Sequence, residues 1–429
     1  MVSQQVLAVL NRTSVPSHHI LFGPPGTGKT TTVVEAIEQV WRMIPGSRIL
    51  VTAPSNTAAD LLAERLLKDV DKEQILRWMS PSRNGEDIKK CLVPITQFEK
   101  LDADFILKHR IVITTLTSAA RVSGKVRQGT FTHVFVDEAG QATEPETLIP
   151  IVGILGQKGQ VILSGDPHQL GPVVKSNLGI KYGLGMSLLE RLMTQCQLYQ
   201  KDKDTGLLDK RYITKLKKNF RSHPDLINIP SRLFYEGELQ PQVKREKAVK
   251  LDKLNWLPKK GFPLVLHCME SPHAKSDKGH SISNAAEVET VTEYLSKVLL
   301  RFPPHQVGLL SPYKKQVLMI KEAIQKRFSK TVCKDILVGS TEEFQGQERE
   351  VRGVCFNRVH PCILVHSLIN LSFAKGHDHL NRAIDVCQAR REENQQNWTN
   401  AERVCSQRAR HAAERNLRRS DERPRLPRQ

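Results

Sequence analysis

The chain has 429 residues, a length that suits two or three domains rather than one. Hydrophobic residues make up 39% of it, which excludes a wholly disordered protein, and 64 Lys and Arg against 45 Asp and Glu give a net charge of +19. This charge makes a polyanion a reasonable partner, with a merely basic surface as the alternative. Eight cysteines without a C-x-x-C pair argue against a zinc site or a secreted disulfide framework. The sequence predicts neither a signal peptide nor a membrane-spanning segment, so we expect no membrane partner.

Short apolar runs alternate with longer amphipathic stretches in the first half of the chain. Buried strands are predicted at residues 18–22, 48–53, 111–115, 133–136 and 160–164, with helices at 31–43 and 58–70. A second set follows, with strands at 263–267, 307–311 and 336–339 and helices at 285–300 and 313–328. Such alternation is typical of an α/β fold in which helices cover both faces of a parallel sheet. The sequence therefore predicts two tandem α/β domains.

Residues 23–30 read Gly-Pro-Pro-Gly-Thr-Gly-Lys-Thr and match the phosphate-loop pattern G-x-x-x-x-G-K-[ST] in full. The pattern lies between a predicted strand and a predicted helix, which disfavours the alternative of a chance glycine-rich turn. Backbone N–H groups of such a loop bind phosphate at the helix N-terminus. We expect Lys29 to bridge the β- and γ-phosphates and Thr30 to bind Mg²⁺. The predicted nucleotide-binding residues are Gly23, Pro24, Pro25, Gly26, Thr27, Gly28, Lys29 and Thr30.

Two carboxylates follow the apolar strand at 133–136. Asp137 is expected to hold Mg²⁺, directly or through water, and Glu138 to orient and deprotonate the attacking water. The next strand ends in Gly-Asp-Pro-His-Gln, and Gln169 is suited to sensing the γ-phosphate by hydrogen bonding. The alternatives are a solvated turn for the acid pair and ordinary turn chemistry for Gly-Asp-Pro. Their position after apolar strands, downstream of a phosphate loop, favours the catalytic interpretation.

Two other classes of nucleotide hydrolase are less consistent with the sequence. A GTPase usually carries the guanine-reading tetrapeptide Asn-Lys-x-Asp, which this chain lacks. An AAA-type ATPase does not account for the second predicted α/β domain.

The ordered motifs together resemble those of superfamily-one helicases. Besides the phosphate loop and the acid pair, the resembling segments are residues 5–9 (Q motif), 53–60 (Ia), 113–115 (Ic), 165–170 (III), 218–224 (IV) and 339–348 (V). Residues 131–146, 233–239 and 257–263 resemble the Upf-type branch, and within it the Moloney leukaemia virus ten (Armitage-type) helicases. The resemblance implies two RecA-like P-loop domains and a 5′→3′ ATP-driven RNA translocase acting in RNA silencing or cytoplasmic RNA turnover.

The same resemblance implies roles for further residues and for partners. Gln5 would read adenine, Glu348 would hold the ribose, and Phe220 would stack on adenine where the family commonly has Tyr. Arg221 would be the arginine finger on the γ-phosphate. Single-stranded RNA would be bound by Ser55, Asn56, Thr114 and Thr115, for which helix capping is the alternative. The resemblance also implies ATP and Mg²⁺ as cofactors and silencing or RNA-decay proteins as partners. We expect a monomer in the cytoplasm, with ribonucleoprotein granules as a further location.

The chain departs from the family after motif V. No segment of the form R-x-N-V-A-x-T-R-A follows, and residues 381–429 hold twelve Arg and no Lys. We therefore predict a RecA-like domain 1 at 1–205, an incomplete domain 2 at 206–350 that lacks its last strands, and a divergent, disordered Arg-rich tail at 351–429. Alternative splicing or a shifted reading frame would explain this tail, as would true divergence. Because the Q motif begins at residue 5, we also expect this chain to lack the family's upstream β-barrel.

Two functions from different classes remain open. The first is an ATP-dependent RNA helicase, and the second is a truncated non-motor form that binds ATP and RNA or partners but hydrolyses ATP poorly. The missing motif VI favours the second, whereas the complete phosphate loop, the acid pair and Arg221 favour the first. A DNA helicase is a further alternative, because contacts to the phosphate backbone do not distinguish the sugar. RNA is preferred on the family resemblance.

Overall fold

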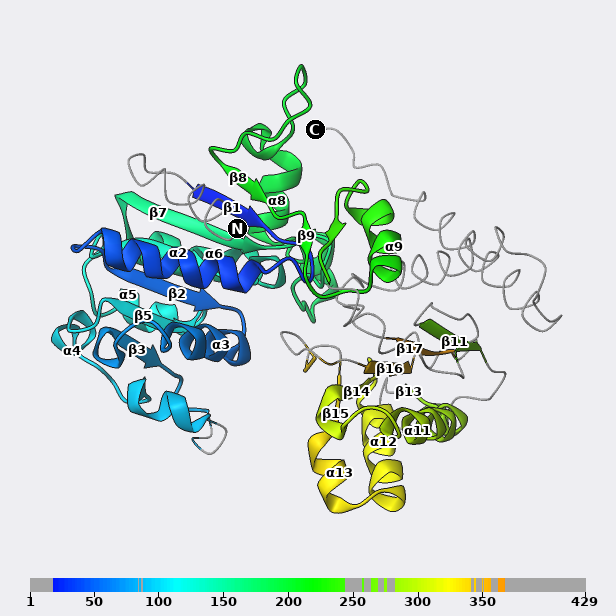
Figure 1. Ribbon diagram of the computed structural model, residues 1–429. Coiled ribbons are helices and arrows are strands. Elements are labelled where there is room, and N and C mark those ends of the chain that lie inside the picture. The colour runs from blue at the N-terminus through cyan, green and yellow to red at the C-terminus, as the bar shows by residue number, and fades with distance from the viewer. Residues whose placement is uncertain are drawn as a thin grey trace. The chain divides into compact units, whose positions relative to one another are not determined.

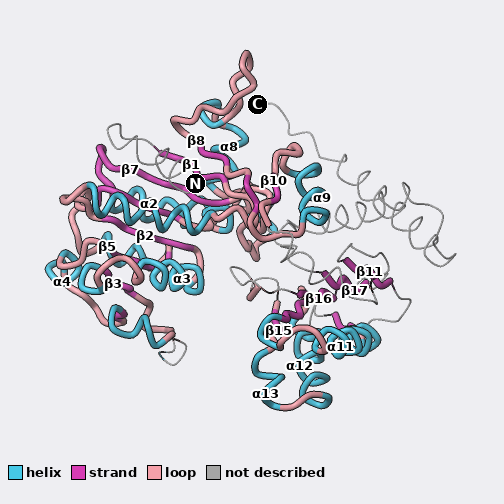
Figure 2. The backbone as a smooth tube through the Cα atoms, viewed as in Figure 1, coloured by secondary structure: helices cyan, strands magenta, loops and turns pink. Residues whose placement is uncertain are grey.

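The computed structural model describes two units of the chain. The described residues are 18–243 without 84, 86 and 87, then 257, 264–268, 274–275, 282–340, 343–344, 349, 351–355 and 362–366. The chain divides into compact units at Met1–Lys218 and Asn219–Gln429. Each unit is built from strands and helices that alternate along the chain (Figures 1 and 2). The predictions for Gln5, for Glu348 and for the chain beyond residue 366 lie outside the described residues.

The first unit contains a sheet of eight strands among its described residues, and every strand pair in it is parallel. In spatial order the strands are β4 (Thr96–Gln97), β3 (Ile75–Trp78), β5 (Ile111–Thr115), β2 (Ile49–Ala53), β6 (Phe131–Val136), β7 (Leu155–Gly165), β1 (His18–Phe22) and β8 (Ile213–Lys215). The helices are α2 (Lys29–Met43), α3 (Asn56–Leu66), α4 (Ala103–Leu107), α5 (Ala119–Ser123), α6 (Glu144–Ile154), α7 (Asn177–Lys181) and α8 (Leu188–Gln195).

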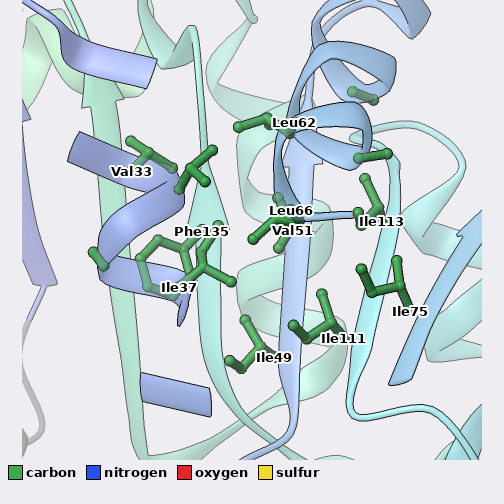
Figure 3. Packing of buried hydrophobic residues seen from close by; sticks show 14 of the residues in the cluster. Val33, Ile37, Ile49, Val51, Leu62, Leu66, Ile75, Ile111, Ile113 and Phe135 are labelled. Carbon is green, nitrogen blue, oxygen red and sulfur yellow. The ribbon is translucent and has the colours of Figure 1, made fainter. Parts of the chain in front are cut away.

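Helices α2 and α3 pack on one face of this sheet (Figure 3). Their apolar side chains recur at helical spacing and contact alternate residues of the strands, as expected for side chains that point to opposite faces of a strand. Members of this buried cluster include Val33, Ile37, Leu62, Leu66, Ile49, Val51, Ile111, Ile113 and Phe135. The intervening strand residues Leu50, Val112 and Val134 are equally buried. Both faces are therefore covered, as the unbroken apolar strands predict.

The second unit has its own five-stranded sheet among the described residues. In spatial order its strands are β11 (Leu264–Cys268), β17 (Cys362–His366), β16 (Val351–Cys355), β14 (Val307–Leu310) and β15 (Leu337–Gly339). The short strands are β9 (Lys218–Asn219), which spans the division between the units, β10 (Gln240–Pro241), β12 (Ala274–Lys275) and β13 (Ile282–Ser283). The helices are α9 (Pro224–Phe234), α11 (Ala285–Leu299), α12 (Lys314–Arg327) and α13 (Lys330–Asp335).

The prediction of an α/β fold is confirmed, and most predicted elements lie within two residues of their observed bounds. The second sheet differs from the expectation of parallel strands, because β17 pairs antiparallel with both β16 and β11. Only a short connection separates β16 from β17, and a short connection joins antiparallel strands. The tail predicted from residue 351 therefore begins inside the sheet: Val351–Cys355 pairs parallel with β14.

The boundary between the units also differs from the predicted one at 205/206. Strand β8 lies beyond this predicted boundary, yet it pairs parallel with β1. His19 on β1 adds a side-chain hydrogen bond of 3.0 Å to Thr214. These contacts place β8 in the first unit, which ends at Lys218. No helix within the described residues is long and apolar enough to cross a membrane.

A buried acidic side chain in the first unit should make the free energy of unfolding depend on pH. Glu38 on α2 is only 5% exposed, and burial together with the Asp69 and Glu35 carboxylates raises its pKa to about 7. Between the ordinary glutamate pKa and this value the folded chain keeps a proton that the unfolded chain releases, so stability is lost as the pH rises. We expect Glu38→Gln to recover about 1–2 kcal/mol above neutral pH and little below about pH 5.

Thermal melts across this pH range check the prediction for Glu38. The exposed Glu289 on α11 offers a matched control, because Glu289→Gln removes the same charge without relieving burial. A melting temperature of Glu38→Gln that exceeds wild type equally at acid and alkaline pH would contradict the titration of Glu38.

Candidate active site

The sheet register of the first unit brings three strand ends to one edge. Phe22 at the end of β1 is paired with Gly165 at the end of β7, and Val136 at the end of β6 is paired with Leu163 of β7. The phosphate loop, the acid pair and the Asp166 turn each begin directly after these ends. Ligands of parallel α/β sheets bind at this carboxyl edge, so the register assembles the predicted site.

The phosphate loop has the backbone geometry that its glycines permit. Gly26 and Gly28 have φ values of 74° and 82°, in the left-handed region that favours glycine. The Gly23 N–H donates to the Gly165 carbonyl at 3.0 Å, and the Thr27 hydroxyl donates to the Pro24 carbonyl at 2.6 Å. Helix α2 begins at Lys29, so its first N–H groups lie in the loop, where they can bind an anion.

Lys29 and Glu138 form a direct ion pair, with 2.7 Å between Nζ and Oε2. Burial by itself would lower the pKa of Lys29, but the carboxylates of Glu138, Asp137 and Asp166 outweigh it and raise that pKa above its ordinary value. Lys29 is therefore a charged group at neutral pH. Glu138 itself has φ 54°, a conformation that is uncommon for a residue other than glycine. Gln141 donates to the same Glu138 oxygen at 3.2 Å.

Asp137, the other member of the acid pair, contacts Thr30. The Thr30 hydroxyl lies 3.3 Å from Asp137 Oδ2, while Ser164 donates to Asp137 Oδ1 at 2.9 Å. Burial and the neighbouring Glu138 charge raise the pKa of Asp137, and Lys29 and Ser164 act against that rise. Asp137 is thus held in its buried position by charge and hydrogen bonding.

The chemistry of these oxygens fits Mg²⁺. The hydroxyl of Thr30 and the carboxylate of Asp137 are the hard oxygen ligands that this ion prefers, and Mg²⁺ usually keeps waters and substrate phosphates as its other ligands. Within the described part of the chain no group of three or more His, Cys, Asp or Glu side chains could hold a metal ion. Thr30 and Asp137 would therefore hold Mg²⁺ jointly with a phosphate group.

Gln169 is held by Asp166, in the turn that follows β7. The Gln169 amide donates to Asp166 Oδ2 at 2.7 Å, and the His168 N–H donates to Oδ1 at 3.0 Å. This turn packs closely on the segment after β6, since a Cβ at Gly140 would lie 2.9 Å from the Asp166 carbonyl oxygen. Only glycine permits that approach. Sensing of the γ-phosphate by Gln169 stays a prediction.

Ser55 and Asn56 lie at the start of α3, at the same edge of the sheet. Ser55 caps the helix, with its hydroxyl accepting from the Ala58 N–H at 3.1 Å. Helix capping, the alternative to RNA binding, therefore accounts for this contact. Asn56 Oδ1 accepts from Nη2 of Arg77 at 2.9 Å. Ser55 is exposed and Asn56 is half-buried, so both remain within reach of a ligand.

Thr114 and Thr115 end the neighbouring strand β5. Thr114 is fully buried, and its hydroxyl donates to the Trp78 carbonyl at 2.9 Å. The Thr115 hydroxyl accepts from the Ser118 N–H at 3.4 Å and is also buried. Both threonine side chains therefore support the local structure, and contact of any of the four residues with RNA stays a prediction.

Phe220 and Arg221 lie in the second unit, in the turn before α9. Asn219 fixes this turn, with its side-chain oxygen accepting from the N–H groups of Arg221 at 3.0 Å and Ser222 at 2.7 Å. The Phe220 ring is 57% exposed, which leaves its face open for stacking. Arg221 is half-buried. The two side chains thus come from one short loop whose shape Asn219 sets.

Sequence reasoning assigned no role to several side chains that shape the site. Ser164 ends the predicted strand at 160–164, Asp166 occurs within the motif III segment, and Gln141 follows the acid pair. Ser164 contacts Asp137 from a distant part of the sequence, whereas Asp166 and Gln141 contact side chains three residues away. Their position at or shortly after the ends of predicted strands was the available signal. Arg77 gave no signal at all, because an arginine inside a short apolar run argues against a buried strand.

Comparison with known proteins gives matches along nearly the whole chain. Two family models, both described as an AAA domain, match residues 2–96 with 86–177 and residues 184–386. The two matches follow each other along the chain, so the second half, which a single AAA-type ATPase domain leaves unexplained, is matched as well.

Three relatives define the branch. "Putative helicase mov-10-B.1" of Danio rerio is 42% identical over 412 residues, which cover 90% of this chain and 40% of the relative. "Probable RNA helicase armi" of Drosophila melanogaster is 34% identical over 418 residues, with 86% and 34% covered. "Regulator of nonsense transcripts 1 homolog" of Drosophila melanogaster is 31% identical over 386 residues, with 81% and 31% covered. The chain thus spans less than half the length of these relatives. It belongs to the Upf-type family of superfamily-one helicases, in the branch of the MOV-10 and Armitage proteins.

Proposed function

We propose that this chain is the motor region of an ATP-dependent RNA helicase. The observation that carries the proposal is the pairing of Lys29 with Glu138 and of Thr30 with Asp137, because it joins a phosphate loop to a catalytic acid pair. The helicase relatives support RNA as the substrate. The 5′→3′ direction, the role in RNA silencing or cytoplasmic RNA turnover, and a cytoplasmic location with silencing or decay proteins as partners rest on the family resemblance.

The residues of the first unit suggest how hydrolysis proceeds. The loop N–H groups and Lys29 would bind the phosphates of ATP, and Glu138 would accept the proton of the attacking water. The water oxygen bonds to the γ-phosphorus as the bond to the bridging oxygen breaks, which releases ADP and phosphate. Mg²⁺ bound by Thr30 and Asp137 would supply neutralisation of the phosphate charge. Arg221 and Phe220 keep their predicted roles, as the arginine on the γ-phosphate and the ring on adenine, within this proposal.

Glu138 must change partners during this cycle. Its carboxylate binds Lys29 at 2.7 Å, and a phosphate group would compete for the same ammonium. Binding of ATP therefore releases Glu138 for its role as a base.

A non-motor form remains the second candidate because no motif VI segment follows motif V in the sequence. Steady-state ATPase assays with single-stranded RNA, and with DNA of the same sequence, separate the candidates. We expect RNA to stimulate hydrolysis and DNA to stimulate it less. Stimulation by neither would support the non-motor form, and stimulation by DNA alone would overturn the assignment of RNA.

Strand direction requires a separate assay. Duplexes with a single-stranded RNA overhang at either the 5′ or the 3′ end would be mixed with the protein and ATP. We expect unwinding only of the duplex with the 5′ overhang. Unwinding that depends on the 3′ overhang would contradict the proposed direction.

A further inference from the structure

A buried arginine joins the two segments that were predicted to bind RNA. Arg77 lies on β3 with no exposed surface, and β3 is the neighbour of β5 in the sheet. Its guanidinium donates from Nε to Asp60 Oδ1 at 2.9 Å and from Nη2 to Asn56 Oδ1 at 2.9 Å. Both acceptors belong to α3, which starts directly after the motif Ia loop.

The third guanidinium nitrogen is connected to the motif Ic strand, β5, through a carbonyl oxygen of β3 itself. Arg77 Nη1 donates to the Trp78 carbonyl at 3.2 Å, and the Thr114 hydroxyl donates to that same carbonyl at 2.9 Å. One backbone oxygen therefore links Arg77 to the end of β5. The planar guanidinium holds its donors in a fixed geometry, so it can set the distance between the two segments.

Among the described residues, a second arginine gives this cluster a net positive charge. Arg83 donates to both oxygens of Asp60, from Nη1 at 3.1 Å and from Nη2 at 2.7 Å. Two guanidinium groups thus share the single carboxylate. Asn56, the neutral member of the cluster, is the first residue of α3. The excess positive charge of the arginines therefore lies next to a side chain that can face a ligand.

Arg77 also determines which way the Asn56 amide points. Arginine has only donors, so the amide atom that faces it is the carbonyl oxygen, and the NH₂ group points away. In the part of the chain that the structure describes, no group accepts a hydrogen bond from this NH₂. A phosphate oxygen is an acceptor without a donor, which makes it the complementary ligand.

We propose that Arg77 is a positioning residue for nucleic-acid binding, which orients the Asn56 amide so that its NH₂ donates to a backbone phosphate and fixes the motif Ia loop relative to the end of β5. This inference rests on the proposed function, because it requires that the chain bind a nucleic acid at this edge. Arg77 itself is buried and acts through Asn56. Aspartate at position 56 would keep the contact with Arg77 but present a carboxylate oxygen to the phosphate.

Two variants of Asn56 test the orientation. Binding of a fluorescent single-stranded RNA is measured at one salt concentration, beside thermal melts of the same samples. We expect Asn56→Ala to weaken binding about tenfold, the loss of one hydrogen bond to a charged group. Asn56→Asp should weaken it further by repulsion, while its melting temperature stays at or above wild type, because the new carboxylate balances the two arginines. A merely structural Asn56 would make stability and affinity fall together.

A double-mutant cycle tests whether Arg77 acts through Asn56. Arg77→Met keeps a long side chain and leaves Asp60 paired with Arg83. We expect it to weaken RNA binding several-fold alone and to have no further effect in Asn56→Ala. Arg110 is a matched control at the opposite, amino ends of the strands, directly before β5. Its guanidinium donates to the Trp41 and Ile44 carbonyls. Arg110→Met should lower the melting temperature and leave the RNA affinity of the folded protein unchanged.

The outcomes separate this inference from the proposed function. Wild-type protein that binds no RNA would refute the proposed function itself. If wild type binds RNA, then wild-type affinity of either Asn56→Asp or Arg77→Met overturns the positioning role. An Arg77→Met effect of equal size in the Asn56→Ala background would also overturn it. Should Arg77→Met fail to fold, Asn56→Asp, which retains Arg77, decides the question.

Discussion

Glu138→Gln will bind ATP and fail to hydrolyse it. A glutamine keeps the shape of the side chain but accepts no proton, so we expect the turnover rate to fall by about 10²–10⁴-fold, the usual contribution of a general base. ATP affinity should rise at the same time. In wild type Lys29 must exchange the Glu138 carboxylate, 2.7 Å away, for a phosphate, and the variant removes that competitor.

Single-turnover hydrolysis and the affinity for a fluorescent ATP analogue measure the two effects separately. The exposed Glu73 supplies a control, because Glu73→Gln removes an acidic group at the surface. Hydrolysis by Glu138→Gln at a rate near that of wild type would mean that another group takes the proton. A loss of ATP binding would instead mean that Glu138 holds the loop in shape.

Lys29→Met will lose ATP binding and also destabilise the first unit. The charged Lys29 is the group through which the loop would hold the γ-phosphate, so we expect affinity for ATP to fall by about 10²-fold or more. Its removal also leaves Asp137 and Glu138 without their cation. Breaking a buried ion pair by removing one partner typically costs about 3–5 kcal/mol.

The instability of Lys29→Met should depend on pH in a defined direction. Burial and Glu138 already raise the pKa of Asp137, and Lys29 opposes that rise, so the variant raises it further. A carboxyl group with a raised pKa keeps its proton in the folded chain over a range in which the unfolded chain has released it. Stability is then lost as the pH rises.

Thermal melts at acid and alkaline pH check this direction. We expect the gap between wild type and Lys29→Met to be widest at the alkaline end. Lys158→Met, at an exposed position on β7, should show no such gap. A deficit of Lys29→Met that narrows as the pH rises would contradict the assigned pairing with the acidic groups.

Much of the first unit could be predicted from the sequence because its signals are local. The apolar runs at β1, β2, β5 and β6 and the glycine pattern of residues 23–30 each depend on neighbouring residues only. Parallel strands with short turns must then bring their carboxyl ends to one edge. For this reason the proximity of Thr30 to Asp137, observed at 3.3 Å, followed from the motif order.

Strand β3 could not be predicted because its stability depends on distant groups. A buried Arg77 conflicts with the rule that charged residues avoid the core, and its hydrogen bonds to Asp60 and Asn56 of α3 remove that conflict. Strand β8 likewise lies in a Lys-rich segment and is specified by its pairing with β1. Neither partner can be read from the local pattern.

The sequence by itself therefore determined the α/β class, the phosphate loop, the acid pair and the family resemblance, since these follow from residue type, spacing and order. The tertiary structure decided which groups meet. It paired Lys29 with Glu138, placed Ser164 on Asp137, extended the second sheet through β16 and β17, and made Arg77 the link between two segments. Contacts of this kind depend on long-range packing, in which a charged group can be buried once its partners surround it.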